Sequence, residues 1–129
     1  MVMAATDDSG TKWEVQLRKG SLDLVILAAL RGRCLYGLEL LGLMQGFDSF
    51  AISEGTLYPL LDRLRRDGVV DAHWKQEGES KPRKYYQLTP LGERRLADFT
   101  QRWRNGVADI EHLLSHPGPA PLNRRVQAR

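Results

Sequence analysis

Cysteine, long apolar runs and targeting signals are scarce or missing in this sequence. Cys34 is the single cysteine, which excludes an intrachain disulfide and a thiolate cluster for a structural metal. The longest apolar stretch, Leu22 to Leu30, is interrupted by Asp23 and falls far short of the roughly 20 residues that span a bilayer. The N-terminal segment has no apolar core, so it does not read as a signal peptide. These absences predict a protein of the reducing cytoplasm without a membrane partner.

Signatures of catalysis and of cofactor binding are also missing. There is no Gly-rich phosphate loop, no nucleophile elbow, and no pair of carboxylates that the pattern places in one pocket. His112 and His116 have the i, i+4 spacing of helical metal ligands, but no third ligand accompanies them, so helix surface is the expected place for both. The sequence predicts neither an enzyme nor a site for a metal or cofactor.

What is present suits one globular core. Of 129 residues, 42% are apolar and 27% are charged, which is ordinary for a soluble domain. The formal net charge of +3 allows a polyanionic partner without requiring one, so the local distribution of charge must decide.

Three helices are expected before residue 68. The pattern turns helical from Trp13 to Leu30, and Ser21 is the expected N-cap of the main helix. A second, short helix is expected from Tyr36 to Met44, closed by Gly46. A third begins after Ser53 and carries a core-facing stripe of leucines at i, i+4 and i+7: Leu57, Leu61 and Leu64.

The period then changes to that of strands. Val70, Ala72 and Trp74 alternate with polar residues, and a second strand is expected from Arg83 to Leu88. Together they predict a β-hairpin.

The last helix opens at Thr89-Pro90, with threonine as N-cap and proline at the first helical position. Apolar residues then recur at steps of three and four: Leu96, Phe99, Trp103, Val107, Ile110 and Leu114. One small domain does not need so long a stripe, so this helix is expected to pair with another.

The expected fold class is mainly α with a small β-hairpin, a winged helix-turn-helix followed by a long C-terminal helix. We expect a flexible arm at 1–12, a DNA-binding domain at 13–89, a dimerisation helix at 90–115 and a disordered basic tail at 116–129.

In a winged helix the third helix enters the major groove of DNA and the hairpin touches the flanking backbone. Small residues at the start of this helix would let its backbone approach phosphates, and its basic residues would reach phosphates or base edges. The expected DNA-binding residues are Ser53, Gly55, Thr56, Tyr58, Arg63 and Arg66 on the helix, and Lys81, Arg83, Lys84 and Tyr85 on the hairpin.

Several motifs in order resemble the PadR family of bacterial regulators. They are Leu17-Arg18-Lys19-Gly20-Ser21-Leu22, Leu35-Tyr36-Gly37, Ser53-Glu54-Gly55-Thr56-Leu57-Tyr58-Pro59, and Lys81-Pro82-Arg83-Lys84-Tyr85-Tyr86-Gln87-Leu88-Thr89. The resemblance implies a cytoplasmic homodimer that joins through its C-terminal helix and represses transcription from a pseudo-palindromic operator. It also implies release by a small apolar or phenolic effector. A single C-terminal helix is similar to the short subgroup, in which an aromatic residue at the place of Trp103 lines a pore between subunits.

Plainer interpretations stay open beside these. The third helix alone would serve as a core helix with a solvated face, and the basic hairpin as an ordinary turn. A tryptophan in a helical stripe more often packs against a neighbour than binds a ligand. The apolar stripe from Leu96 to Leu114 is therefore assigned to dimer contact or effector contact, and both roles stay open. A winged helix that binds proteins without specific DNA binding is the alternative function.

Overall fold

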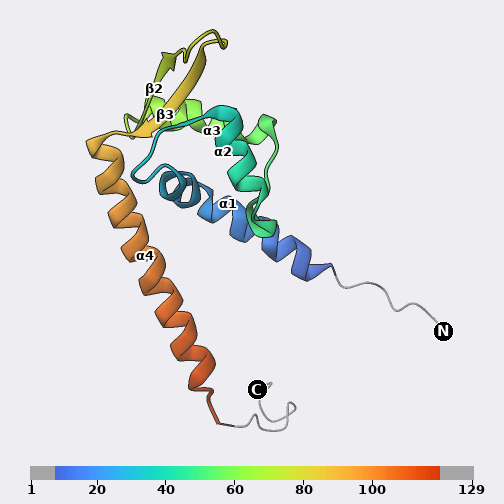
Figure 1. Ribbon diagram of the computed structural model, residues 1–129. Helices are drawn as coiled ribbons and strands as arrows, with labels where there is room; N and C mark the ends of the chain where they lie inside the picture. Colours follow the sequence, from blue (N-terminus) through green and yellow to red (C-terminus); the bar gives the residue numbers. More distant parts are fainter. Residues whose placement is uncertain (1–7, 120–129) are drawn as a thin grey trace, which may run out of the picture. The chain divides into compact units, whose positions relative to one another are not determined.

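The computed structural model describes residues 8–119. The elements are α1 (Ser9–Ala29), β1 (Leu35–Tyr36), α2 (Gly37–Gln45), a 3-10 turn η1 (Asp48–Phe50), α3 (Glu54–Arg66), β2 (Val70–Lys75), β3 (Arg83–Leu88) and α4 (Pro90–Ser115) (Figure 1). The predicted fold class, mainly α with a small β element and a long C-terminal helix, is confirmed. By their internal contacts the residues form an N-terminal unit ending at Phe99 and a C-terminal unit starting at Thr100.

Helix α1 begins twelve residues before its predicted N-cap. Ser21 lies inside the helix, which starts at Ser9, so part of the predicted flexible arm is helical. Charged pairs one turn apart support this first half, as between Arg18 and Glu14 at 4.0 Å. The Arg18 Nε also donates to the carbonyl oxygen of Ser49 in η1 at 2.8 Å. This tertiary contact supports the first half of α1. The local sequence did not predict the contact.

The hairpin is part of a three-stranded antiparallel sheet in the order β1-β3-β2. The two residues of β1 pair with the middle strand, Leu35 opposite Tyr86 and Tyr36 opposite Tyr85. Strand β1 was not predicted, because two residues show no period and form a strand only when a partner strand is present.

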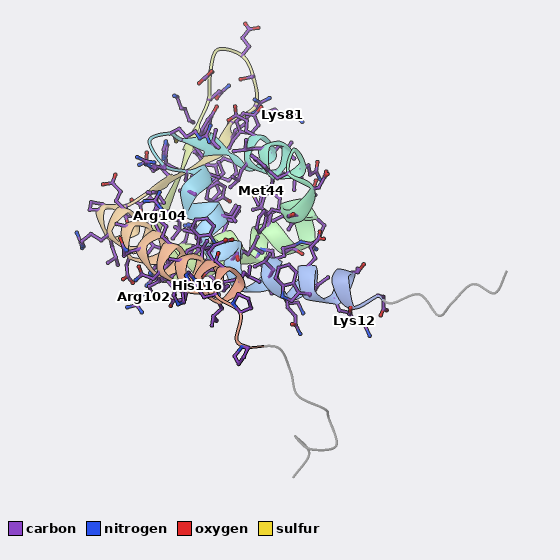
Figure 2. All side chains as sticks on the ribbon, turned by 90° about the horizontal axis from the view of Figure 1, so that it is seen from below. Lys12, Met44, Lys81, Arg102, Arg104 and His116 are labelled. Carbon is purple, nitrogen blue, oxygen red and sulfur yellow. The ribbon has the colours of Figure 1, made fainter. Side chains whose placement is uncertain are left out.

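The core lies between α1, α2, α3 and the sheet. Its fully buried side chains include Ile26 and Leu27 from α1 and Leu40 and Met44 from α2, with Met44 among the side chains between the helices in Figure 2. The predicted leucine stripe of α3 is confirmed, since Leu57, Leu61 and Leu64 are fully buried. Burial of one such side chain contributes roughly 1.5–3 kcal/mol.

The end of α3 is packed backbone to backbone against the start of α4. Gly68 ends α3 with φ of +79°, the left-handed conformation that glycine adopts without strain. The Thr89 hydroxyl donates to the Gly68 carbonyl at 2.7 Å and accepts from the Gly92 amide at 3.0 Å, which confirms Thr89 as N-cap. A Cβ on Gly92 would collide with the carbonyl oxygen of Val69. This junction sets where β2 starts relative to α3.

In the C-terminal unit, the described residues through 119 continue α4 and form no core among themselves. Residues 101–119 are all exposed in this single chain, and α4 ends at Ser115. Residues 1–7 of the predicted arm and 120–129 of the predicted tail lie outside the described residues.

Candidate nucleic-acid interface

The N-terminal turn of α3 is open to a partner. Ser53, Gly55 and Thr56 are all exposed. Ser53 holds the N-cap position in an extended conformation, but its hydroxyl donates to the Thr56 hydroxyl at 3.4 Å instead of capping a backbone amide. The Ser53 carbonyl accepts from the amides of Thr56 and Leu57. The small side chains leave the positive end of the helix dipole accessible to an anion.

Tyr58 was predicted to contact DNA, but it packs within the fold. It is half-buried and packs against the core, with its hydroxyl directly over Gly37, where a Cβ would collide with it. Burial raises the pKa of the Tyr58 phenol, and the Glu54 carboxylate raises it further. Tyr58 therefore positions the first turn of α2 against α3.

Arg63 was expected to reach DNA, but its guanidinium is held by α1. The two terminal nitrogens donate to the two carboxylate oxygens of Asp23, at 2.6 and 3.2 Å. This bidentate geometry is the strongest that an arginine–carboxylate pair adopts. The hydrogen bond to Asp23 raises the pKa of Arg63.

The ion pairs continue from Arg63 to α4. Asp67 lies 3.7 Å from the Arg63 guanidinium and 3.3 Å from that of Arg95. Asp23, Arg63, Asp67 and Arg95 thus form a chain from α1 through the end of α3 to α4, which we call the charge chain. Arg63 therefore links α3 to α1 and, through Asp67, to α4.

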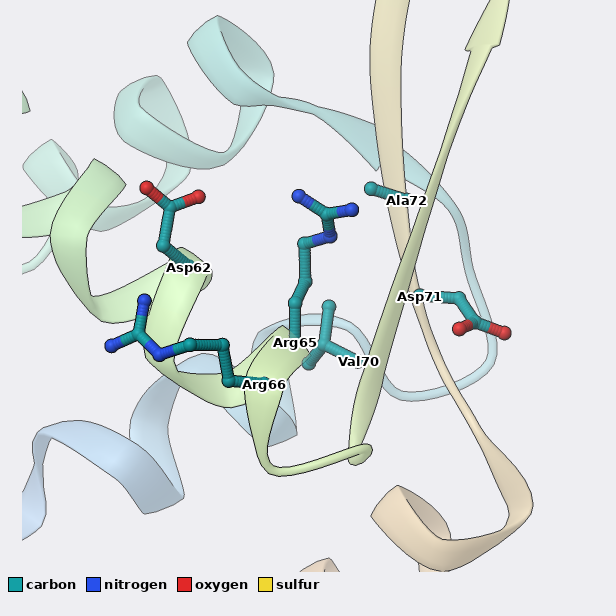
Figure 3. Close-up of a pocket in the computed structure, with 6 residues that line it drawn as sticks. All are labelled: Asp62, Arg65, Arg66, Val70, Asp71 and Ala72. Atoms are coloured by element: carbon teal, nitrogen blue, oxygen red, sulfur yellow. The ribbon is translucent and has the colours of Figure 1, made fainter.

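Two other arginines of α3 border an open hollow beside β2. Arg65, Arg66 and Asp62 from α3 line it together with Val70, Asp71 and Ala72, and its volume is about 330 Å³. Figure 3 shows the Arg65 side chain in the space between α3 and β2, with Asp71 turned to the other side of the strand. Arg66 was predicted as a DNA contact and is exposed. Arg65, also exposed, was not among the predicted contacts.

The strand register divides the basic residues of the hairpin between two faces. Trp74 lies opposite Lys84, and Lys75 lies opposite Arg83. Because successive side chains alternate across a strand, Lys84 shares a face with buried Tyr86, while Arg83 lies on the other face with Tyr85. Lys81 lies between the two strands, in the connecting loop (Figure 2).

On the face that carries Arg83 and Tyr85, both side chains contact aromatic rings. The Arg83 guanidinium lies 4.3 Å from the ring centre of Tyr36, a cation–π distance. Tyr85 contacts Tyr36 edge to face at 5.5 Å and stacks with His73 at 6.2 Å. Tyr85, predicted to face outward, is half-buried in this row.

The predicted apolar stripe of α4 is divided between the two units. Leu96 is buried in the core of the N-terminal unit and half-buried Phe99 packs against it, so Leu96 offers no surface to a partner. Trp103, Val107, Ile110 and Leu114 belong to the C-terminal unit and are exposed. Within the predicted stripe, this second group is the part that is accessible to a partner.

Other kinds of site find little support in residues 8–119. No three His, Cys, Asp or Glu side chains of these residues are grouped to hold a metal ion. His112 and His116 stack with ring centres 4.4 Å apart. None of the helices described has the length and apolar character to cross a bilayer. Burial raises the pKa of the Cys34 thiol, Glu39 raises it further, and Lys75 opposes this.

The chain is similar to PadR-like transcriptional regulators in sequence and in fold. The model of the PadR-like family of transcriptional regulators matches residues 26–98. A PadR family transcriptional regulator from Eggerthella lenta is 34% identical with a TM-score of 0.73, covering 84% of this chain and 94% of that one. A PadR-like transcriptional regulator from Bacillus cereus is 31% identical with a TM-score of 0.71, covering 81% and 99%. An uncharacterised protein from Lysinibacillus sphaericus is 32% identical over 98 residues, which are 74% of this chain and 86% of that protein.

Proposed function

Because the chain belongs to the PadR-like family of transcriptional regulators, and is therefore a DNA-binding regulator and not an enzyme, we propose that it acts as a homodimeric, ligand-responsive repressor in the cytoplasm. The observation that supports this most directly is the exposed N-terminal turn of α3, next to a hairpin rich in cations. The small residues would meet phosphates at the helix terminus, and the cations would neutralise backbone charge.

We assign DNA contact to two groups of the predicted residues. Ser53, Gly55, Thr56 and Arg66 lie exposed on or before α3, and Lys81, Arg83 and Lys84 lie on the hairpin. Arg65 joins them because it borders the same hollow as Arg66. Tyr58 and Tyr85 are half-buried and Arg63 is paired with Asp23, so we place these three residues outside the contact set.

The exposed stripe of the C-terminal unit supports dimerisation. Trp103 is 52% exposed, Ile110 58% and Leu114 71%, along one helix whose polar residues lie between them. Large apolar side chains spaced this way on a soluble protein mark an interaction surface, and a second copy offers the matching stripe. A two-fold dimer would place two α3 helices on a pseudo-palindromic operator, with half-sites about one helical turn apart.

Trp103 is the proposed effector contact. A small apolar or phenolic molecule at the dimer seam would meet its ring, and would shift DNA affinity only by its differential affinity for the two states of the dimer.

The test combines sedimentation of the full chain with a fluorescence titration against DNA upstream of its own gene, at two salt concentrations. A dimer that binds this DNA in the nanomolar range, far more tightly than random DNA, supports the proposal. Salt sensitivity should correspond to several phosphate contacts per subunit. A monomer would overturn the dimer seam and the effector site with it.

A winged helix that docks on proteins is the second candidate, favoured by the exposed apolar surface of α4. Weak DNA binding of any sequence, with a salt slope equivalent to one or two phosphates, would favour it over the repressor.

A further inference from the structure

Two histidines form a pair on the open surface at the end of α4. His112 lies in the last turn of the helix and His116 directly follows its final residue, Ser115; Figure 2 shows His116 at that end. The two imidazole rings stack with their centres 4.4 Å apart and their planes inclined by 21°. Both side chains are exposed, so burial in a core does not account for the pairing.

The backbone already holds one ring nitrogen of the pair. The Nδ1 atom of His116 lies 3.0 Å from the carbonyl oxygen of His112. Because a carbonyl oxygen only accepts hydrogen bonds, Nδ1 carries the proton of this contact, and the lone pair of the neutral ring is on Nε2. Histidines that bind metals commonly donate their second ring N–H to a carbonyl oxygen or a carboxylate in this way. The contact therefore leaves Nε2 of His116 available as a ligand.

The spacing and the surrounding charges both favour a cation beside the rings. Two histidines at i and i+4 on one helix face are the spacing that holds zinc in helical metal sites. The C-terminal end of a helix carries partial negative charge, which attracts cations. The Asp109 carboxylate lies one turn before His112 on the same face, whereas residues 105–119 contain no lysine or arginine. A dication at this end of α4 therefore meets attraction and no competing ammonium or guanidinium from its own segment.

The histidine pair lies on the side of α4 away from the apolar stripe. His112 follows Trp103 by nine residues, which is about two and a half helical turns. The imidazoles therefore project from the side opposite to the one that carries Trp103, Ile110 and Leu114. A second copy that covered the stripe would leave the pair accessible, so each subunit would keep its own site.

We propose that His112 and His116 bind a divalent transition-metal ion such as Zn²⁺, with both imidazoles as ligands and water in the remaining positions. Imidazole nitrogen suits Zn²⁺, Ni²⁺ and Cu²⁺, whereas Mg²⁺ and Ca²⁺ take oxygen ligands. Because both rings are exposed, they can turn to the roughly 2.0–2.1 Å of a zinc–imidazole bond without disturbing any packing.

This site would couple the metal to the helix itself. A closed structural zinc site has four protein ligands, so a site with two exchanges its ion with the free pool. The i, i+4 geometry exists only in the helical state, and a ligand that binds one state stabilises that state. Zn²⁺ would therefore stabilise the last turn of α4. The inference does not rest on the proposed DNA-binding function.

Isothermal titration calorimetry of the full chain with ZnCl₂, and with MgCl₂ for comparison, tests the site. The wild type should bind one Zn²⁺ per subunit and no Mg²⁺ at the same concentrations. His112→Gln and His116→Gln should each weaken zinc binding by at least about tenfold, because a single imidazole cannot chelate. His73→Gln is the matched control, since His73 is the third histidine of the chain and lies in β2. It should bind zinc like the wild type.

A second measurement locates the ion on the helix. Zn²⁺ should slow amide hydrogen exchange in the last turn of α4 and shift the NMR signals of the two imidazoles in that turn, with those of His73 unchanged. Glutamine favours helix formation, so the variants should keep the helical circular-dichroism signal. The proposal is overturned by a wild type that binds no Zn²⁺. It is equally overturned by a doubly substituted His112→Gln, His116→Gln protein that binds Zn²⁺ with wild-type affinity. Both results leave the DNA titration, and the function it tests, unaffected.

Discussion

The two units of this chain both carry apolar side chains on helices but differ in whether those side chains are buried. In the N-terminal unit, apolar side chains from three helices and the sheet close over one another, and residues such as Leu27 and Leu64 are fully buried. In the C-terminal unit, the helix from Thr100 to Ser115 buries none of its residues in the described chain. The first unit is therefore stabilised by its own core, whereas the second exposes an apolar stripe whose burial depends on another molecule.

The largest expected effect comes from a matched pair of glycine substitutions in α4. Gly92→Ala should lower the free energy of unfolding by about 3 kcal/mol or more, because its Cβ would meet the backbone carbonyl of Val69. Gly106→Ala has nothing within 4 Å and should raise helix stability by roughly 0.5–1 kcal/mol. Urea unfolding measures both. Equal effects of the two substitutions would mean that the units do not differ in packing.

Trp103→Ala tests the second unit at its apolar stripe. Truncation of an exposed aromatic anchor should weaken self-association by about 2 kcal/mol, or roughly 30-fold, with the near-ultraviolet circular dichroism of the N-terminal core retained. Sedimentation velocity over a range of concentrations measures the change. Arg104→Ala, the next residue, is the control. A Trp103→Ala protein that sediments like the wild type would remove Trp103 from the dimer seam.

A double-mutant cycle on Asp23 and Arg63 tests the charge chain within the first unit. Both side chains are partly exposed, so their coupling in urea unfolding should be about 1 kcal/mol or less. Because Asp23 already holds the Arg63 guanidinium, Arg63→Ala should leave the salt slope of DNA binding unchanged, whereas Arg66→Ala should reduce it by about one. A reduced slope for Arg63→Ala would return that residue to the DNA interface.

The smallest effect concerns Cys34 in the N-terminal unit. Burial raises the pKa of its thiol above the ordinary range of a cysteine, so the folded protein holds less thiolate than the unfolded chain near pH 8. Alkylation by iodoacetamide should be slower in the native protein than in guanidinium. By linkage, the stability from this shift is present below the unfolded pKa and is lost as pH rises through the folded pKa. Equal alkylation rates in the two states would contradict the shift.

Local patterns predicted most of the elements correctly. The period of the leucines identified α3 and its buried face, and Gly68 and Thr89 marked the end of α3 and the start of α4. Such features depend on side chains within a few residues of one another, so their physical cause is contained in the sequence window. The pattern indicated a helix from Trp13, so only the first turn of α1, residues 9–12, was missed. Strand β1 was missed because it forms by pairing with the distant strand β3.

The predicted site likewise combines features that local sequence determines with contacts that come from distant residues. The sequence by itself determined which segment offers a small, open helix terminus and where the cations cluster, since both follow from residue type and spacing. Only the tertiary structure decided which partner each of these side chains contacts. It bound Arg63 to Asp23, 40 positions away, laid Arg83 over Tyr36, packed Tyr58 above Gly37 and left Trp74 uncovered. Ion pairs and ring contacts between remote positions depend on how the elements pack, which no local period records.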